Sequence, residues 1–237
     1  MLRRMCIFLA SLVLAAASVL FSASAAGAAP VLSADWSGYA AVGSYDLVQA
    51  SWVVPAVTCA SGSQYSSVWV GLGGYNSSTV EQIGTEADCS NGTPVYYAWY
   101  QFYPDQRHTF SEPVHPGDEL IAFSAYNPDQ KNYNMGISDY PGFWRELPVG
   151  AASVPPPSSA EVIVGLPPCD SGCIPPLANF GTVSITEALV NAAPLGNANP
   201  LQIIMTTGTR GQKKDTVSAL STSITGSDFS ATWASAG

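Results

Sequence analysis

Short runs of β-branched and aromatic residues, each ended by turn-forming residues, set the strongest limit on what this chain can fold into. Clusters of Gly, Pro, Asn and Asp separate the runs, as strand connections require. No window of about 12 residues keeps a helical period without a glycine or proline interrupting it. The pattern predicts an all-β fold, a sandwich of two antiparallel sheets. The predicted strands are 38–43, 47–54, 66–73, 79–84, 95–103, 119–126, 132–139, 160–165, 181–188, 201–207 and 216–222.

The first 29 residues are typical of a secretory signal peptide. Arg3 and Arg4 precede an apolar run that finishes in small residues. We therefore predict a secreted protein that loses residues 1–29 and folds as a single domain over 30–237. No later stretch approaches the roughly 18 apolar residues that a membrane helix needs, so we expect no membrane partner after signal removal.

The charge of the remaining chain excludes several classes of partner. Removing Arg3 and Arg4 from the eight basic residues leaves six against 17 acidic ones, a net charge of −11. An acidic, lysine-poor surface argues against nucleic acid or an anionic membrane as partner. It suits an acidic exterior, where protonation reduces self-repulsion. We expect a monomer with no cofactor.

Four cysteines follow the signal peptide, and an even number in an exported chain indicates disulfides. We predict the pairs Cys59–Cys89 and Cys169–Cys173. The first would close a loop of about 30 residues and contribute roughly 3 to 4 kcal/mol. The alternative is a zinc site, but it needs tighter ligand spacing and nearby histidines, so we expect no metal.

Nucleophile motifs such as G-x-S-x-G and H-E-x-x-H are absent. His108 and His115 flank a predicted loop and lack a Ser or Cys context, so we expect them at the surface. Catalysis based on histidine is therefore not expected.

The segment YYAWYQFYP, residues 96–104, is dense in aromatic side chains. Strand alternation puts one set of side chains on one face and the other set on the opposite face. One face can be core while the other lines a groove for an extended peptide or a sugar chain. The alternative is burial of both faces between two layers. The two sets are Tyr97, Trp99, Gln101 and Tyr103, and Tyr96, Ala98, Tyr100 and Phe102.

Eight segments in order resemble the blocks of one family, the glutamic peptidases or eqolisins. They are WSGYA (36–40), VQASWVVP (48–55), VWVGLGG (68–74), EQIGTEADC (81–89), YYAWYQFYP (96–104), VHPGDEL (114–120), SAEVIVGLP (159–167) and ANFGTVSIT (178–186). The resemblance implies a concanavalin A-like sandwich with a cleft on one sheet. It also implies endopeptidic hydrolysis at acid pH. In that reaction a glutamate acts as general base on water, and a glutamine positions the water and stabilises the oxyanion.

The resemblance assigns the family's glutamine to Gln82, but its catalytic glutamate falls on Gly165. The preceding glutamate of the same strand is kept as Glu161, about 13 Å along the strand from residue 165. Glu161 is therefore not expected to substitute as the base. A shifted strand would leave Glu161 or Glu146 as alternatives. We expect the side chain of Gln82 to lie directly opposite the backbone of residue 165.

Other acidic positions of the family are also replaced. Gly73 stands where an aspartate is common, and Gln101 stands where a glutamate is expected. Glu86 keeps a carboxylate that we expect near Gln82. The resemblance assigns the remaining substrate-binding positions to Trp36, Trp69, Trp99 and Tyr103.

Three hypotheses follow. The chain is a glutamic-type acid endopeptidase, working or weakened, or a pseudopeptidase whose lectin-like groove binds a peptide or a polysaccharide. The third is a structural surface protein. The loss of the base favours weakened catalysis, because such a loss costs about 10² to 10⁴-fold in rate and leaves some residual activity.

Overall fold

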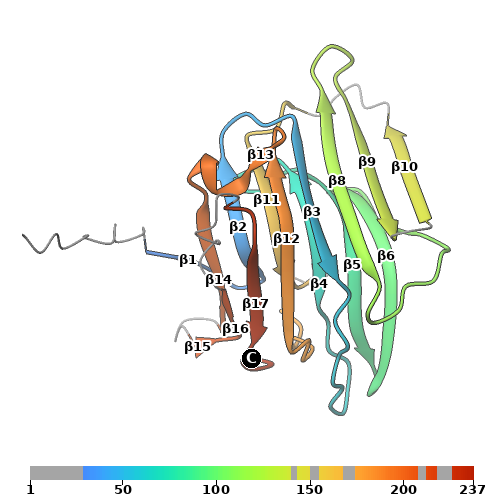
Figure 1. Cartoon of the computed structure of the whole chain (residues 1–237). Helices are drawn as coiled ribbons and strands as arrows, with labels where there is room; N and C mark the ends of the chain where they lie inside the picture. Colours follow the sequence, from blue (N-terminus) through green and yellow to red (C-terminus); the bar gives the residue numbers. More distant parts are fainter. Residues whose placement is uncertain (1–28, 140–142, 150–154, 168–173, 208–211, 218–225) are drawn as a thin grey trace, which may run out of the picture.

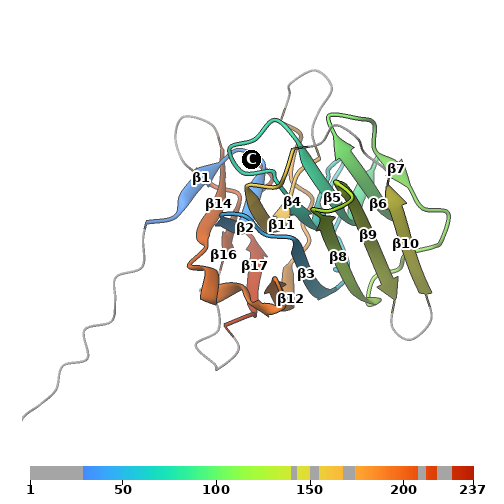
Figure 2. The same cartoon turned by 90° about the horizontal axis from the view of Figure 1, so that it is seen from above.

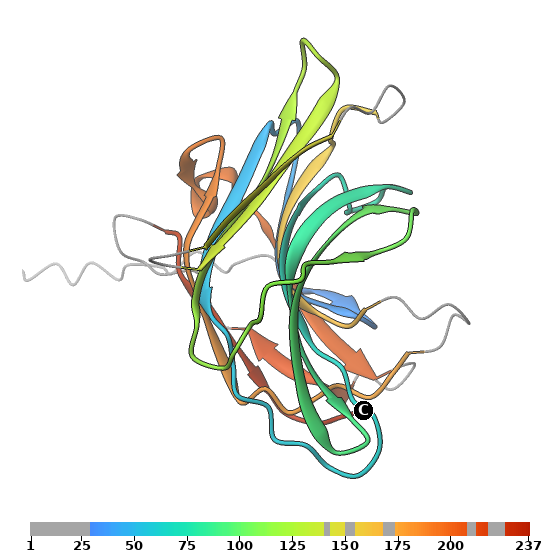
Figure 3. The same ribbon diagram turned by 90° about the vertical axis from the view of Figure 1, so that its right-hand side faces the viewer.

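A computed structural model describes residues 29–139, 143–149, 155–167, 174–207, 212–217 and 226–237. Its strands form two sheets that pack as layers (Figures 1 and 3). Among these described strands, every pairing is antiparallel except that of β1 with β14. The predicted sandwich is thus confirmed. No helix in the described part of the chain is long and apolar enough to cross a membrane.

Within the described residues, the first sheet has nine strands. In spatial order they are β1 (Val31–Ser33), β14 (Leu201–Thr207), β2 (Trp36–Val42), β11 (Ser159–Gly165), β4 (Ser67–Leu72), β5 (Val80–Ser90), β6 (Thr93–Tyr103) and β7 (His108–Thr109), with β15 (Gln212–Lys213) beside β14.

The second sheet has eight strands in the part of the chain that the structure describes. In spatial order they are β10 (Phe143–Val149), β9 (Asn132–Asp139), β8 (Glu119–Asn127), β3 (Leu47–Val53), β12 (Thr182–Val190), β17 (Phe229–Trp233) and β16 (Asp215–Val217), with β13 (Ala193–Pro194) beside β12. A short 3₁₀ helix, η1 (Leu195–Ala198), follows β13. In Figure 2, β1 and β14 lie at the opposite end of the molecule from β9 and β10.

The main core fills the space between the sheets. It contains Val70 and Ile83 from the first sheet and Trp52 and Ile137 from the second, and all four are buried. A smaller apolar cluster lies on the opposite, outer face of the first sheet and includes Trp69, Trp99 and Ile163. Alternate residues of β4, β5, β6 and β11 therefore face the core or this outer face, as strand geometry requires.

The strand of residues 96–104 alternates as predicted. Tyr96, Ala98, Tyr100 and Phe102 pack with the main core, and Tyr97 and Trp99 belong to the outer cluster. The outer face is not simply open, however. Trp99 is 1% exposed, whereas Tyr103 is 40% exposed. The outer face is thus buried at the middle of β6 and open at its end. This result lies between the two alternatives, a groove-lining face and burial of both faces.

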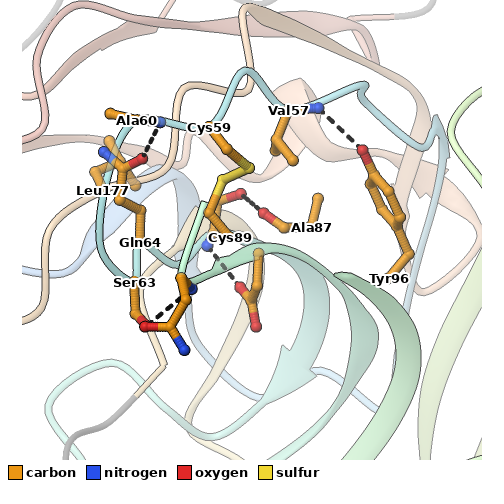
Figure 4. The surroundings of a disulfide bond; sticks show 12 residues. Val57, Cys59, Ala60, Ser63, Gln64, Ala87, Cys89, Tyr96 and Leu177 are labelled. Carbon is orange, nitrogen blue, oxygen red and sulfur yellow. Dashed lines mark hydrogen bonds between the residues drawn. A yellow bond between two sulfur atoms is a disulfide. The ribbon is translucent and has the colours of Figure 1, made fainter. Parts of the chain in front are cut away.

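The disulfide Cys59–Cys89 is confirmed (Figure 4). It joins the end of β5 to the loop after β3, where the Val57 N–H donates to Tyr96 Oη at 3.1 Å and the Ala60 N–H donates to Gln64 Oε1 at 3.0 Å. The predicted pair Cys169–Cys173 lies outside the described residues. His108 and His115 are exposed, as expected.

Candidate active-site cleft

A cleft of about 170 Å³ opens on the outer face of the first sheet. Its residues come from β2, β4, β5 and β6 and from the loops beside them. They are Asp35, Trp36, Ser67, Trp69, Gly74, Ser77, Thr79, Val80, Gln82, Trp99, Tyr103, Arg107, Leu166 and Pro167. The predicted residues Trp36, Trp69, Gln82, Trp99 and Tyr103 thus lie together along one cleft.

Gln82 is held in one orientation by a chain of amide hydrogen bonds. Its Nε2 donates to Gln101 Oε1 at 2.9 Å, and Gln101 Nε2 donates to the carbonyl oxygen of Asp105 at 2.8 Å. An amide nitrogen carries two hydrogens, so Gln82 has a second N–H beside the one that Gln101 accepts. Gln101 does not line the cleft itself, and its role in the described residues is to position Gln82.

Residue 165 borders the cleft without a side chain. Gly165 pairs with Ser67, whose Oγ donates to the Gly165 carbonyl oxygen at 3.1 Å. A Cβ on Gly165 would stand 3.0 Å from the Asp35 carbonyl oxygen and 3.3 Å from Trp69 Nε1. The position can therefore take a side chain only if these neighbours shift by a few tenths of an ångström.

The expected alignment of Gln82 with residue 165 is wrong. Across the strands, Gln82 pairs with Gly71, and Gly71 pairs with Glu161. Gly165 instead lies in the row of Ser67 and Glu86. Because β5 and β11 both pair antiparallel with β4, Gln82 and Gly165 share one face but are four residues out of register. Both still border the same cleft, Gln82 directly and Gly165 through Ser67 and Leu166.

Glu161 shares a row with Gln82, but it has a different task. It is fully buried, and its Oε1 accepts a hydrogen bond from the Tyr75 N–H at 2.9 Å. Burial raises its pKa to about 7, although hydrogen bonds from Ser159 and the 74–75 backbone oppose this. Glu161 anchors the loop after β4 and does not line the cleft. The other alternative, Glu146, lies in β10 of the second sheet.

Glu86 does not lie beside Gln82, because the two residues are about 13 Å apart along β5. It forms a buried ion pair with Arg107, whose guanidinium also lies 4.2 Å above the centre of the Trp99 ring. Burial raises the pKa of Glu86 well above its ordinary value, and Arg107 counteracts this only in part. Arg107 thus covers Trp99 and forms one wall of the cleft.

Trp69 of β4 lies directly beside Gly84 of the neighbouring strand β5. A Cβ on Gly84 would stand 2.1 Å from the Val68 carbonyl oxygen and 2.6 Å from Trp69 Cβ, so only glycine fits there. Trp36 meets the Trp69 ring edge to face, with centroids 5.0 Å apart. This packing gives the cleft a rigid aromatic floor.

Asp35, Ser67 and Arg107 are cleft residues that the sequence analysis missed. Asp35 directly precedes the segment WSGYA, and Arg107 lies three residues beyond the end of YYAWYQFYP. In the sequence, only their positions next to segments that resemble the family could have marked them as cleft residues. The described residues contain no group of His, Cys, Asp and Glu side chains that could hold a metal ion.

Comparisons with known proteins find the same fold. The solved structures of scytalido-glutamic peptidase with a transition state analog inhibitor (TM-score 0.71, 20% identity) and of SCP-B, an eqolisin in a complex with the tripeptide Ala-Ile-His (0.68, 19%), share the fold. Both alignments cover 85% of this chain and 98% of the other. Aspergilloglutamic peptidase from Aspergillus niger has a TM-score of 0.58 at 20% identity, covering 72% and 99%.

None of the curated proteins is similar enough in sequence to count as a match. The model of the Peptidase A4 family, however, matches residues 34–233, which include every strand of the two sheets except β1. On this match the chain belongs to the Peptidase A4 family, the eqolisins.

Proposed function

We propose that this chain is a secreted peptide-binding member of the family whose hydrolysis of proteins at acid pH is weakened. The observation that carries the proposal is the contrast within one cleft. Gln82 and the aromatic lining are in place, whereas Gly165 offers no carboxylate at the position that the family resemblance assigns to the base. Export is supported by the apolar run behind Arg3 and Arg4.

The cleft can bind an extended peptide. Half-buried Trp36, which packs on Trp69, and exposed Tyr103 provide apolar faces, and the amide of Gln82 provides a polar group. The neighbour SCP-B was solved with Ala-Ile-His, which makes this tripeptide a suitable probe. Titration of the protein with Ala-Ile-His, followed by tryptophan fluorescence, is expected to saturate.

The test of weakened catalysis is digestion of unfolded casein between pH 2 and pH 5. We expect the parent protein to cleave at least about 10²-fold more slowly than the Gly165→Glu variant, because a positioned general base contributes 10² to 10⁴-fold. Gly165→Gln is the matched control, since it adds the same bulk without an ionisable group. A parent that cleaves as fast as Gly165→Glu would contradict the proposal.

The aromatic lining also favours a second candidate, a non-catalytic groove that binds polysaccharide. The exposed ring of Tyr103 and the half-buried ring of Trp36, next to polar groups, suit sugar faces as well as peptides. Binding to a glycan array, with no casein cleavage by Gly165→Glu and no binding of Ala-Ile-His, would support this candidate over the first.

A further inference from the structure

The cleft has one basic wall. Among the described residues that line it, Arg107 is the single basic one. Its guanidinium carbon lies 4.2 Å from the centre of the Trp99 ring, and Trp99 belongs to the outer face of the first sheet and lines the cleft. The charged end of Arg107, and not only its aliphatic stem, therefore packs on a ring of the cleft.

Arg107 is held in place, but its donors are not all used. A guanidinium carries five N–H donors, and Nη1 of Arg107 donates to Glu86 Oε1. Nε and Nη2 make no hydrogen bond to any residue that the structure describes. The side chain of Arg107 is 19% exposed, whereas that of Glu86 is fully buried. The ion pair thus orients the guanidinium and leaves several of its donors without a described partner.

The acidic groups around Arg107 favour their neutral forms at pH 5. Two carboxyl groups, Glu86 and Asp88, act on the guanidinium. Burial raises the pKa of Glu86 well above its ordinary value and that of Asp88 to about 6. Burial also raises the pKa of the Tyr97 hydroxyl, so this group is neutral as well. Since an arginine stays protonated, the cluster favours a net positive charge at pH 5.

Arg107 stands within reach of a peptide that contacts Gln82. Trp99, on which Arg107 packs, pairs with Gly84 across β5 and β6, and Gly84 is two residues from Gln82. Two residues of an extended chain span about 7 Å. A peptide in contact with the Gln82 amide can therefore place a group from the next residue, or from the one after it, at the guanidinium.

The single acid among the described residues that line the cleft, Asp35, lies away from this wall. Its carbonyl oxygen accepts from the Leu166 N–H at 2.8 Å, directly after β11, and β4 and β5 separate β11 from β6. Its Oδ1 accepts a hydrogen bond from Ser33 Oγ at 2.8 Å. Asp35 is therefore not a partner that neutralises Arg107.

We infer that Arg107 is a specificity-determining residue that binds a carboxylate group of the peptide in the cleft. The fork of an arginine matches the two oxygens of a carboxylate, and such charge-assisted hydrogen bonds are stronger than neutral ones. The inference rests on the proposed function, because it names the class of peptide that the same cleft prefers. The carboxylate can come from an acidic side chain or from the C-terminus of a short peptide, and the experiment separates these two sources.

The experiment measures peptide binding to the full chain at pH 5, where peptide carboxylates are ionised, by tryptophan fluorescence. One arm compares Ala-Ile-His with its C-terminal amide. The other arm uses acetylated and amidated peptides of Ala, Ile and Ser, in which one Glu, or Gln as its neutral match, is moved from position to position. In at least one arm, the carboxylate peptide is expected to bind about tenfold more tightly than its neutral match. The arm that shows this preference identifies the source of the carboxylate.

Variants of the ion pair assign the preference to Arg107. Arg107→Gln is expected to abolish it, while the neutral peptides still bind. Lys131→Gln is the matched control, because it removes the same charge from an exposed turn before β9, and it is expected to keep the preference. Since Arg107→Gln leaves the buried Glu86 without its cation, the double variant Arg107→Gln/Glu86→Gln removes both members of the pair. It decides the question if the single variant does not fold.

The inference and the proposed function fail in different ways. Equal affinity of the parent for carboxylate and neutral peptides in both arms overturns the role of Arg107 and leaves peptide binding standing. A preference that survives in Arg107→Gln, or in the double variant, does the same. Absence of binding of every peptide to the parent overturns the proposed function itself.

Discussion

At the scale of single residues, the cleft depends on how Gln82 is oriented. An amide can serve an oxyanion only if its N–H, and not its oxygen, points at the developing charge. The donation from Gln82 to Gln101, and from Gln101 to the Asp105 carbonyl oxygen, holds the amide of Gln82 in one orientation. The replacement of an expected glutamate by Gln101 therefore still provides an acceptor for Gln82.

This predicts the effect of Gln101→Leu in the Gly165→Glu background. The variant is expected to lower kcat for casein peptides by roughly tenfold to 10²-fold, because a small misplacement of a catalytic group has effects of this size. KM is expected to change little. Gln130→Leu, at an exposed turn residue, is the control. Equal kcat values for the two variants would exclude a positioning role for Gln101.

The residue scale also shows the limit of what the sequence could predict for the site. Gln82, Trp69 and Trp99 were found because they lie inside recognisable segments. The roles of Asp35 and Arg107 depend on contacts across strands, namely Asp35 against β11 and Arg107 against Glu86. Such contacts are set by sheet register, which a local pattern of residues does not contain.

At the scale of elements, β5 is longer than its pattern predicted. Its apolar alternation was recognised only over residues 79–84, but the strand continues to Ser90. The continuation carries Glu86 and Asp88, which argue locally against a buried strand. Asp88 is satisfied by the Ser66 N–H at 3.1 Å and the Tyr97 hydroxyl at 3.3 Å. Tertiary partners thus override the local signal.

The disulfide fixes the far end of this long strand. Removing it with Cys59→Ala/Cys89→Ala frees a loop of about 30 residues and is expected to lower the free energy of unfolding by roughly 3 to 4 kcal/mol. Urea denaturation at pH 4, followed by tryptophan fluorescence, measures this. Unchanged stability would mean that the packing around Val57 and Tyr96 alone holds the loop.

Among the described strands, those that the sequence did not predict are β1, β7, β10, β13, β15 and β17. Most are short, and several lie at or beside sheet edges. Edge strands need less apolar alternation because only one side pairs, so their pattern is weak. The central strands were predicted because they are rich in the buried β-branched and aromatic side chains that are typical of strands.

At the scale of the whole molecule, the chain buries several carboxyl groups that favour the protonated form. Burial raises the pKa of Glu81 to about 8, that of Glu161 to about 7 and that of Asp88 to about 6. Atoms Oε2 of Glu81 and Glu161 have no hydrogen-bond partner. A folded chain of this kind is suited to acid conditions.

The sign of the resulting pH dependence follows from linkage. Between the unfolded and folded pKa values, the folded state binds more protons than the unfolded state, so its stability falls as pH rises. The contribution of these carboxyl groups to the free energy of unfolding is therefore expected to be fully present below about pH 4. It is expected to decline as the pH rises to about 8. Urea midpoints measured from pH 3 to pH 8 test this, and Glu81→Gln is expected to flatten the decline. A midpoint that rises toward pH 8 would contradict it.

The tight space around Gly165 has one further consequence. The carbonyl oxygen of Asp35 lies where it would crowd any side chain placed on residue 165. A glutamate introduced at that corner would push against the backbone of the aspartate that borders the same corner. The Asp35 carbonyl oxygen would have to shift by a few tenths of an ångström to admit that side chain, so the backbone between β1 and β2 limits which residues position 165 can hold.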